Sequence, residues 1–416
     1  MWKVILLCLL LQTISVSAQF GWLKKLFRSS KSKSSSSSKG ATKLDEIHME
    51  ADGLITSKGY PFEKHWVTTV DGYILELHRI PHGRMSQSTA GNRPVALLQH
   101  GVFGSSKEWL LNSAEQSLPF LLADAGVDVW LGNNRGNSYS KNHTTLSTKQ
   151  KEFWDFSWDE MAKYDLPAEI NYILDATNNK QLYYVGFSQG TTIGFAKFSE
   201  DQQLAKKVKH FIALAPVAHV GHITSGLRKL MPFSKSMKKF LDLFGGGQVK
   251  GNTAFTKTMS NLFCRGFVKK LCMKGHSFIM GDTEGQSINK SRLALYNAQS
   301  ATITSAKVLM QWVQGVKTNK FQHFDHGARG NFWRYGQTTP PLYYPGNITV
   351  PVALFTGGND ALADPTDVSW LLTQINVTHH IDIPWYNHQG LVLGYDAKDV
   401  AYPYLIPIIT GKPWTP

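Results

Sequence analysis

A glycine-flanked serine placed directly after an apolar strand is the feature that most constrains the fold. Leu182–Val185 is typical of a buried strand, the run from Gly186 to Gly190 follows with Ser188 at its centre, and Thr191–Phe198 has a helical pattern. Glycine at both flanks permits a sharp turn from strand to helix, which lifts the Ser188 hydroxyl clear of the backbone. The turn motif alone arises often by chance, so its position between strand and helix carries the interpretation.

Apolar strand-like segments alternate with helical segments on both sides of this turn. That alternation predicts an α/β fold with a mostly parallel sheet covered by helices on both faces. Asp71-Gly72 separates two β-rich runs, which predicts a hairpin ahead of the parallel strands. The predicted elements are strands at His65–Val70, Tyr73–Arg79, Val95–Gln99, Val127–Leu131, Tyr183–Val185, Phe211–Ala215, Val352–Thr356 and His380–Ile383, and helices at Trp158–Leu174 and Thr191–Phe198.

The segment 221–340 interrupts this alternation and holds much of the positive charge. The 416 residues carry a formal net charge of +14, and segment 221–340 alone also carries +14 because it has four acids against 18 Lys and Arg. Its apolar residues fit helices better than strands, so we interpret it as an insertion between two strands of the sheet. A basic segment on an acidic body, without any nucleic-acid-binding motif, argues against nucleic acid as a partner.

The N-terminus is typical of a secreted protein. Residues 1–18 combine Lys3, a short apolar stretch and small residues before Gln19, which predicts a cleaved signal peptide. Residues 19–43 form a basic tail, rich in Ser and Lys, that we expect to be disordered. Four glycosylation sequons agree with entry into the secretory pathway. Their acceptors are Asn142, Asn289, Asn347 and Asn376.

A serine hydroxyl needs a histidine base and an orienting carboxylate before it can attack an ester. After a turn of this kind the two partners follow in the order acid then histidine, each on a loop behind a strand. Asp360 and His388 satisfy that order and those positions. Asp364 precedes Pro365, where capping a helix is the favoured interpretation. The competing candidates are Asp364 and Asp367 for the acid, and His323, His379 and His380 for the base.

Two backbone N–H groups are also needed to stabilise the oxyanion of an acyl-transfer intermediate. The amide of Gln189, directly after the serine, is one candidate, and Val102 in the loop after Val95–Gln99 is the other. His100 in the same loop could be a second base, but we favour a role in orienting the loop by hydrogen bonding.

These motifs resemble the acid lipase family of α/β-hydrolases, the gastric and lysosomal acid lipases, over about residues 46–408. The resemblance implies an α/β-hydrolase core in two parts, 44–220 and 341–416, with 221–340 as a helical cap and lid. It also implies nucleophile Ser188, acid Asp360, base His388, oxyanion donors Val102 and Gln189, and a disulfide between Cys264 and Cys272. We expect no cofactor and no metal, since no further Cys and no spaced His pair completes a zinc site. The motifs that carry the resemblance are Gly59-Tyr60-Pro61, Asp71-Gly72-Tyr73-Ile74-Leu75, Leu98-Gln99-His100-Gly101, Asp128 to Asn137, Phe156 to Ala162, Tyr164 to Ala168, Gly357 to Asp360, Leu362 to Pro365, and Tyr386-Asn387-His388.

The expected activity is hydrolysis of carboxylic esters in neutral lipids, triacylglycerols or sterol esters, at a lipid–water interface in the extracellular space or the lysosomal lumen. The alternatives are a carboxylesterase or thioesterase for smaller acyl substrates and a catalytically inactive lipid-binding protein. The basic segments favour adsorption to an anionic membrane surface. Two departures from the family concern the site: Phe187 stands where relatives usually have His, and Gln389-Gly390 where they usually have Leu-Asp.

Overall fold

The computed structural model describes residues 46–85, 93–233, 246–250, 269–281, 288–299 and 302–414. The predicted signal peptide 1–18, the tail 19–43 and Cys264 lie outside these ranges, and so does the side chain of Cys272. In the described ranges no helix is both long and apolar enough to cross a membrane.

The core of the fold is a nine-stranded sheet in the order β1-β2-β4-β3-β6-β7-β10-β11, with the short β5 paired to β2. Six strands from β4 to β11 run parallel, and β1 and β2 form the antiparallel hairpin predicted around Gly72, which has φ +98°. The predicted α/β fold class is therefore confirmed. The strands are β1 (Glu63–Thr68), β2 (Tyr73–Ile80), β3 (Val95–Gln99), β4 (Asp128–Leu131), β5 (Asn142–His143), β6 (Leu182–Phe187), β7 (Val208–Leu214), β10 (Val352–Gly357) and β11 (Val377–Ile383).

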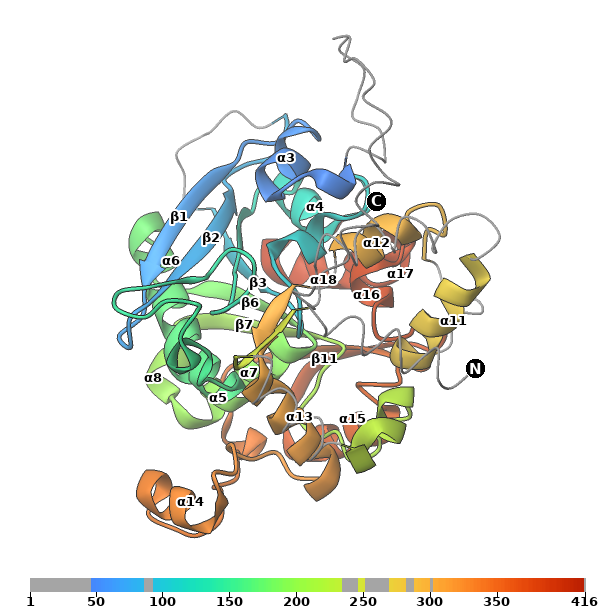
Figure 1. Cartoon of the computed structure of the whole chain (residues 1–416). Coiled ribbons are helices and arrows are strands. Elements are labelled where there is room, and N and C mark those ends of the chain that lie inside the picture. The colour runs from blue at the N-terminus through green and yellow to red at the C-terminus, as the bar shows by residue number, and fades with distance from the viewer. Residues whose placement is uncertain are drawn as a thin grey trace, which may run out of the picture.

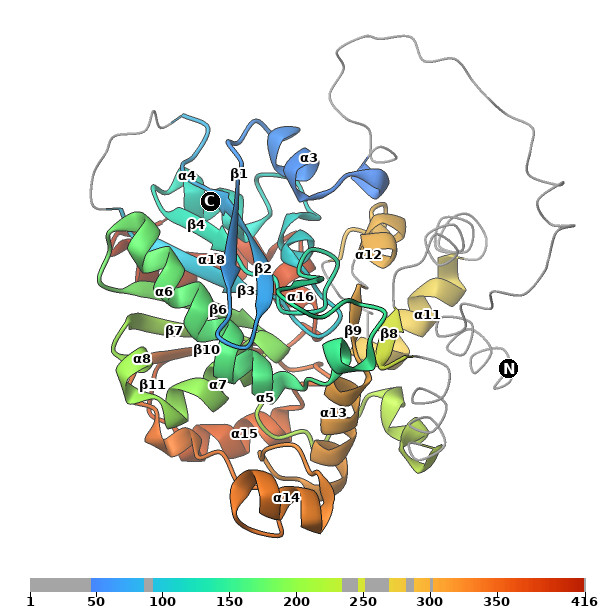
Figure 2. The same cartoon turned by 60° about the vertical axis from the view of Figure 1, so that its left-hand side comes forward.

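Helices cover both faces of this sheet because both faces of its central strands are apolar (Figures 1 and 2). In β3, Ala96 and Leu98 pack into one core cluster while Val95 and Leu97 pack into the other, as the two-residue period of a strand requires. The first face is covered by η1 (Glu46–His48), α3 (Ala51–Thr56), η2 (Ser106–Leu110), α4 (Leu118–Asp124), α16 (Gly390–Leu393), α17 (Ala397–Val400) and α18 (Tyr402–Thr410). The second is covered by η3 (Lys151–Trp154), α5 (Trp158–Glu160), the π-type turn η4 (Met161–Asp165), α6 (Leu166–Thr177), α7 (Gln189–Glu200) and α8 (Gln202–Ala205).

Helix starts follow the local capping signals. Ser157 and Glu160 form a reciprocal capping box at α5. Asp364 accepts a hydrogen bond from Thr366 N at 2.9 Å and is followed by Pro365, so it caps α15 (Pro365–Gln374) as predicted.

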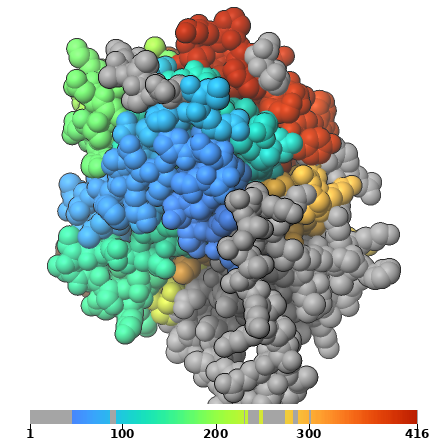
Figure 3. All heavy atoms as spheres, turned by 90° about the horizontal axis from the view of Figure 1, so that it is seen from above, coloured from blue at the N-terminus to red at the C-terminus, as the bar shows by residue number. Residues whose placement is uncertain are grey.

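Segment 221–340 lies between β7 and β10 in the chain. It is not purely helical, because β8 and β9 pair as a small antiparallel sheet. Seen from above, its α12 part (gold) lies beside the N-terminal part of the described chain (blue) and near the C-terminal part (red) (Figure 3). From η5 onward the elements are η5 (Gly226–Phe233), β8 (Gln248–Lys250), α11 (Lys269–Met280), α12 (Leu293–Gln299), β9 (Ile303–Ser305), α13 (Ala306–Thr318) and α14 (Gly327–Tyr335), and η7 (Pro345–Asn347) precedes β10.

Candidate active site

The turn between β6 and α7 holds Ser188 in a strained conformation. Its φ of 52° and ψ of −118° are unusual for a residue with a side chain. The surroundings fix it, because Ser188 N donates to Leu214 O at 3.0 Å and its carbonyl accepts from Thr191 N at 2.8 Å. A Cβ on Gly190 would lie 2.4 Å from the backbone oxygen of Gln99, so only glycine allows this turn to pack against the end of β3.

The three side chains predicted from the loop positions meet at the carboxyl ends of β6, β10 and β11. His388 Nε2 lies 2.7 Å from Ser188 Oγ. His388 Nδ1 lies 2.8 Å and 3.0 Å from the two carboxylate oxygens of Asp360. All three residues are buried. Backbone N–H groups of Leu362 and Ala363 donate to Asp360 Oδ1 at 2.8 Å each, which fixes the carboxylate toward the histidine.

The competing candidates have other partners. Asp364 caps α15, and Asp367 accepts from His222 at 2.7 Å. His323 Nε2 lies 2.9 Å from Glu200 Oε1. His379 and His380 are exposed on β11. Of the candidate acids and bases, only Asp360 and His388 lie in hydrogen-bonded sequence with Ser188.

Gln189 follows the serine at the start of α7, and Val102 follows Gly101 in the loop after β3. Gln189 is the first residue of α7, and Gly101 lies so close to Ser188 that a Cβ on it would be 3.2 Å from Ser188 Cβ. Within the described ranges, neither the Val102 amide nor the Gln189 amide donates to a protein acceptor. Both N–H groups therefore remain available for a ligand oxygen, and the N-terminus of α7 adds its partial positive charge there.

His100 orients the loop rather than facing the serine. Its Nδ1 donates to the Gly101 carbonyl at 2.7 Å, and its Nε2 accepts from Asn134 N and Asn137 Nδ2 at 3.2 Å each. Burial lowers the pKa of His100 to about 4, so the neutral ring that these hydrogen bonds require is the stable form.

Glu108 is a buried acid beside the same loop that the sequence did not single out. Its Oε2 accepts from Gly101 N at 3.0 Å. Burial raises the pKa of Glu108 to about 7, against smaller lowering effects of the Gly101 hydrogen bond and the charge of His388. A single Glu in the short helical turn η2 carries no sequence pattern that marks it as buried, because its burial depends on how the loop at Gly101 folds back over it.

Both departures from the family pattern occupy defined positions. The Phe187 ring packs on the His388 ring with centroids 5.3 Å apart, which gives the base an apolar neighbour. Gln389 Oε1 lies 2.6 Å from His276 Nε2 in α11. A Cβ on Gly390 would lie 2.5 Å from the Tyr386 ring, so the residue after Gln389 must be small.

Segment 221–340 contacts the loops on both sides of the serine. Thr302 donates to Phe103 O at 2.7 Å and, through its hydroxyl, to Gly104 O at 3.0 Å. Trp312 Nε1 donates to Gln189 Oε1 at 3.0 Å. His388 N donates to Met280 O at 3.3 Å. Each of these contacts is a neutral hydrogen bond to a residue next to the reacting groups or to their backbone.

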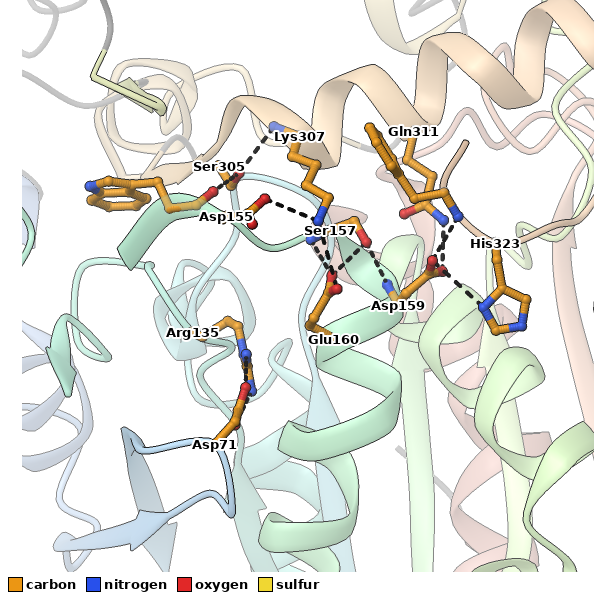
Figure 4. Close-up of polar contacts among 12 residues, drawn as sticks. Asp71, Arg135, Asp155, Ser157, Asp159, Glu160, Ser305, Lys307, Gln311 and His323 are labelled. Carbon is orange, nitrogen blue, oxygen red and sulfur yellow. Dashed lines mark hydrogen bonds and ion pairs between the residues drawn. The ribbon is translucent and has the colours of Figure 1, made fainter. Parts of the chain in front are cut away.

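A polar network fixes α13, and with it Trp312, on the start of α5 (Figure 4). Lys307 pairs with Asp155 at 3.1 Å, and Gln311 donates to the buried Asp159 at 2.7 Å. Tyr343 also donates to Asp159, at 2.9 Å. Burial raises the pKa of Asp159, and the charge of His323 opposes that rise.

The described residues contain no group of three or more His, Cys, Asp or Glu side chains positioned to hold a metal ion. The chemistry that this geometry offers is attack by an activated hydroxyl, with two amides ready to stabilise an anion.

Comparison with known proteins agrees with this geometry. Residues 94–390 match the α/β hydrolase fold family, and residues 52–113 match the partial α/β-hydrolase lipase region. The lysosomal acid lipase/cholesteryl ester hydrolase of Homo sapiens is 45% identical over 366 residues, covering 88% of this chain and 91% of that protein. Lipase member K of Homo sapiens is 44% identical and gastric triacylglycerol lipase of Homo sapiens is 42% identical; each match covers 88% of this chain and 92% of the relative. The chain therefore belongs to the acid lipase family of α/β-hydrolases.

Proposed function

We propose that the protein hydrolyses the carboxylic ester bonds of neutral lipids through an acyl-enzyme on Ser188. The observation that carries the proposal is the continuous hydrogen-bonded chain from Ser188 Oγ through the His388 ring to Asp360, on the scaffold of this family. The 2.7 Å contact is within the reach that proton transfer from a nucleophile to its base requires.

Acylation begins when Ser188 Oγ attacks the ester carbonyl carbon and its proton passes to His388 Nε2. The carbonyl oxygen becomes an oxyanion, which the N–H groups of Gln189 and Val102 stabilise. Asp360 stabilises the imidazolium of His388 without taking its proton. Collapse of the intermediate breaks the bond to the alcohol oxygen, and His388 gives its proton to the departing alcohol.

Deacylation repeats these steps with water. A water molecule transfers a proton to His388 Nε2 and attacks the acyl carbon of the Ser188 ester. The second oxyanion occupies the same pair of amides. Its collapse breaks the bond to Ser188 Oγ, His388 returns the proton to Ser188, and the carboxylic acid leaves.

The substrate class follows from the relatives. Their names specify cholesteryl esters and triacylglycerols, which share a neutral, water-insoluble ester. We assign segment 221–340 as the cap over the acyl site, since its α11, its α13 and Thr302, directly before β9, contact the loops around Ser188. The pairing of Cys264 with Cys272 remains part of this proposal.

We assign the secretory route to the protein, with residues 1–18 as signal peptide and an extracellular or lysosomal destination. Three acceptor asparagines are exposed, as glycosylation requires: Asn142 in β5, Asn347 and Asn376. Asn289 is half-buried and its Oδ1 accepts from the Ser291 hydroxyl, so we expect the lowest occupancy there. Peptide mapping of secreted protein before and after deglycosylation tests both statements.

The basic charge of segment 221–340 and of the tail 19–43 supports adsorption to anionic lipid surfaces, because each Lys or Arg near an anionic leaflet contributes about 1 kcal/mol. Truncation to a chain starting near Lys43 separates the two contributions. If vesicle binding is unchanged by the truncation, the tail has no part in adsorption.

Labelling and a substrate series test the activity. A fluorophosphonate probe should label Ser188, and Ser188→Ala should lose labelling and turnover together. Wild-type protein is then compared on a short-chain soluble ester, a triacylglycerol emulsion and a cholesteryl ester dispersion. Turnover of the soluble ester alone would indicate the carboxylesterase or thioesterase alternative. No turnover and no labelling, with retained lipid binding, would indicate an inactive lipid-binding protein.

A further inference from the structure

One short helix of the cap segment carries its aromatic side chains outward. Helix α14 stands out from the rest of the described ribbon in two views (Figures 1 and 2). Phe332 is 57% exposed and Trp333 is 76% exposed, whereas the polar residue before them in α14, Asn331, is 1% exposed. In the part of the chain that the structure describes, no other pair of neighbouring residues exposes two aromatic rings. A helix covered by its own protein would bury the rings and expose the amide.

Polar contacts hold this inverted helix in place. Asn331 Nδ2 donates to Asp325 Oδ1 at 2.8 Å and to Thr338 O at 3.0 Å, and its Oδ1 accepts from His326 N at 2.8 Å. Tyr335 donates to Phe324 O at 2.9 Å. These contacts fix both ends of a nine-residue helix that would be marginal alone. The exposed rings are therefore presented in one orientation, which lowers the entropy cost of docking.

The charge around the rings is positive. Arg329, Phe332 and Trp333 stand at positions i, i+3 and i+4 and so share one face of α14, and Arg334 follows Trp333 in the chain, about a quarter turn further around the helix. Both arginines are exposed, and neither forms an ion pair with any residue that the structure describes. The sequence from 326 to 359 contains these two arginines and no Asp or Glu. Asp325, directly before this stretch, is exposed, but its Oδ1 accepts from Gly327 N and Asn331 Nδ2, and the two arginines leave residues 325–359 with a net charge of +1.

We propose that Arg329, Phe332, Trp333 and Arg334, the α14 patch, form a docking surface for an anionic lipid–water interface. This inference rests on the proposed function, since a lipase with an insoluble substrate must adsorb to the surface that holds it. Trp and Phe rings insert at the level of the lipid headgroups, where the apolar ring contacts acyl chains and the indole N–H of Trp can bond to headgroups or water. Guanidinium groups beside them pair with headgroup phosphates. A projecting patch suits a deformable lipid surface better than a preformed protein pocket, which would need a matching cavity.

Vesicle binding of the full mature protein tests the α14 patch. The double variant Phe332→Ser/Trp333→Ser should weaken partition onto phosphatidylcholine–phosphatidylserine vesicles about tenfold or more, because the apolar insertion is lost. Arg329→Gln/Arg334→Gln should weaken binding by a similar factor at low salt and much less at high salt or on pure phosphatidylcholine. Trp66→Ser is the matched aromatic control, because Trp66 is 54% exposed on β1, and it should bind as wild type. Lys149→Gln/Lys180→Gln is the charge-matched control on exposed residues of two other loops.

Hydrolysis of a soluble short-chain ester is measured on every variant to separate the patch from the catalytic site. All α14 patch variants should keep wild-type soluble-ester turnover, whereas Ser188→Ala should lose turnover and keep vesicle binding. If turnover fails in the wild type but the patch variants still reduce binding, the proposed function falls and the docking surface stands.

A milder substitution guards against local misfolding. Quenching of tryptophan fluorescence by brominated lipid should fall more in Trp333→Phe than in Trp66→Phe. Equal binding of wild type and the aromatic double variant would overturn the proposal. So would an equal loss in Trp66→Ser, or a change from dimer to monomer in the aromatic variant with unchanged vesicle binding, which would assign the patch to a second copy of the chain.

Discussion

The sheet edge formed by the carboxyl ends of its strands and segment 221–340, the proposed cap, contribute to one site in different ways. Loops behind β6, β10 and β11 supply every side chain assigned a proton or bond-forming step: Ser188, Asp360 and His388. The cap supplies neutral hydrogen bonds that position the groups around them, such as Trp312 to Gln189. The loops at this edge pack backbone against backbone, since a Cβ on Gly190 would lie 2.4 Å from the backbone oxygen of Gln99. The difference implies that substitutions on the two sides should differ in effect by orders of magnitude.

The largest effect is expected at the acid of the sheet edge. Asp360→Asn keeps the volume but removes the acceptor that fixes the tautomer of His388, so kcat should fall by about 10³–10⁴ with the fold intact. Asp364→Asn is the matched control, because Asp364 caps α15 and lies on the same loop. It should leave kcat within about twofold, since Asn is an equally good cap. Comparable losses in both variants would contradict the assignment of the acid.

A smaller effect, on stability and not on the chemical step, is expected at Glu108. Its pKa is about 7 in the folded protein and near the ordinary value of 4.5 in the unfolded chain, so the fold favours the protonated form. This contribution to stability is fully present below the unfolded pKa and is lost as pH rises through the folded pKa. Glu108→Gln should therefore gain free energy of unfolding relative to wild type by about 3 kcal/mol between about pH 4 and about pH 8.

Denaturant titration at both pH values measures this difference. Glu152→Gln, at an exposed carboxylate, is the control and should change equally at both. A difference between wild type and Glu108→Gln that does not depend on pH would show that Glu108 does not titrate in this window.

The smallest effect is expected in the cap. Trp312→Phe removes the hydrogen bond to Gln189 and keeps most of the ring, so kcat/KM should fall about fivefold, the value of one net neutral hydrogen bond of about 1 kcal/mol. Most of the loss should appear in kcat, because the Gln189 side chain that Trp312 holds belongs to the residue whose backbone N–H is assigned to the oxyanion.

Trp158→Phe is the control for Trp312→Phe. Trp158 packs against Trp312 with ring centroids 6.3 Å apart, and its buried indole N–H has no acceptor among the described residues. Kinetics on a soluble ester should therefore show a smaller change for this variant. A loss at Trp312 as large as that at Asp360 would remove the distinction between sheet edge and cap.

The sheet was predictable because its signals are local. Continuous apolar runs marked β3, β6 and β10 within a residue or two, and Asp71-Gly72 marked the hairpin. The paired β8 and β9 in the cap were missed, because three-residue strands have too few positions to show a period. Glu108 and Trp312 were missed for another reason. Their importance depends on which residues the fold places against them, Gly101 for Glu108 and Gln189 for Trp312.

The sequence by itself determined the order of the elements, the glycines that the serine turn needs, and the loops from which a nucleophile, an acid and a base could come. Such features depend on residues near each other in the chain, where backbone geometry and strand or helix period act directly. Only the tertiary structure decided that His388 meets Asp360 and not Asp364 or Asp367, that Glu108 is enclosed beside Gly101, and that α14 turns its aromatic rings outward. Burial and pairing arise between segments far apart in the chain, such as those of Ser188 and His388, which are 200 residues apart, and no local pattern encodes either.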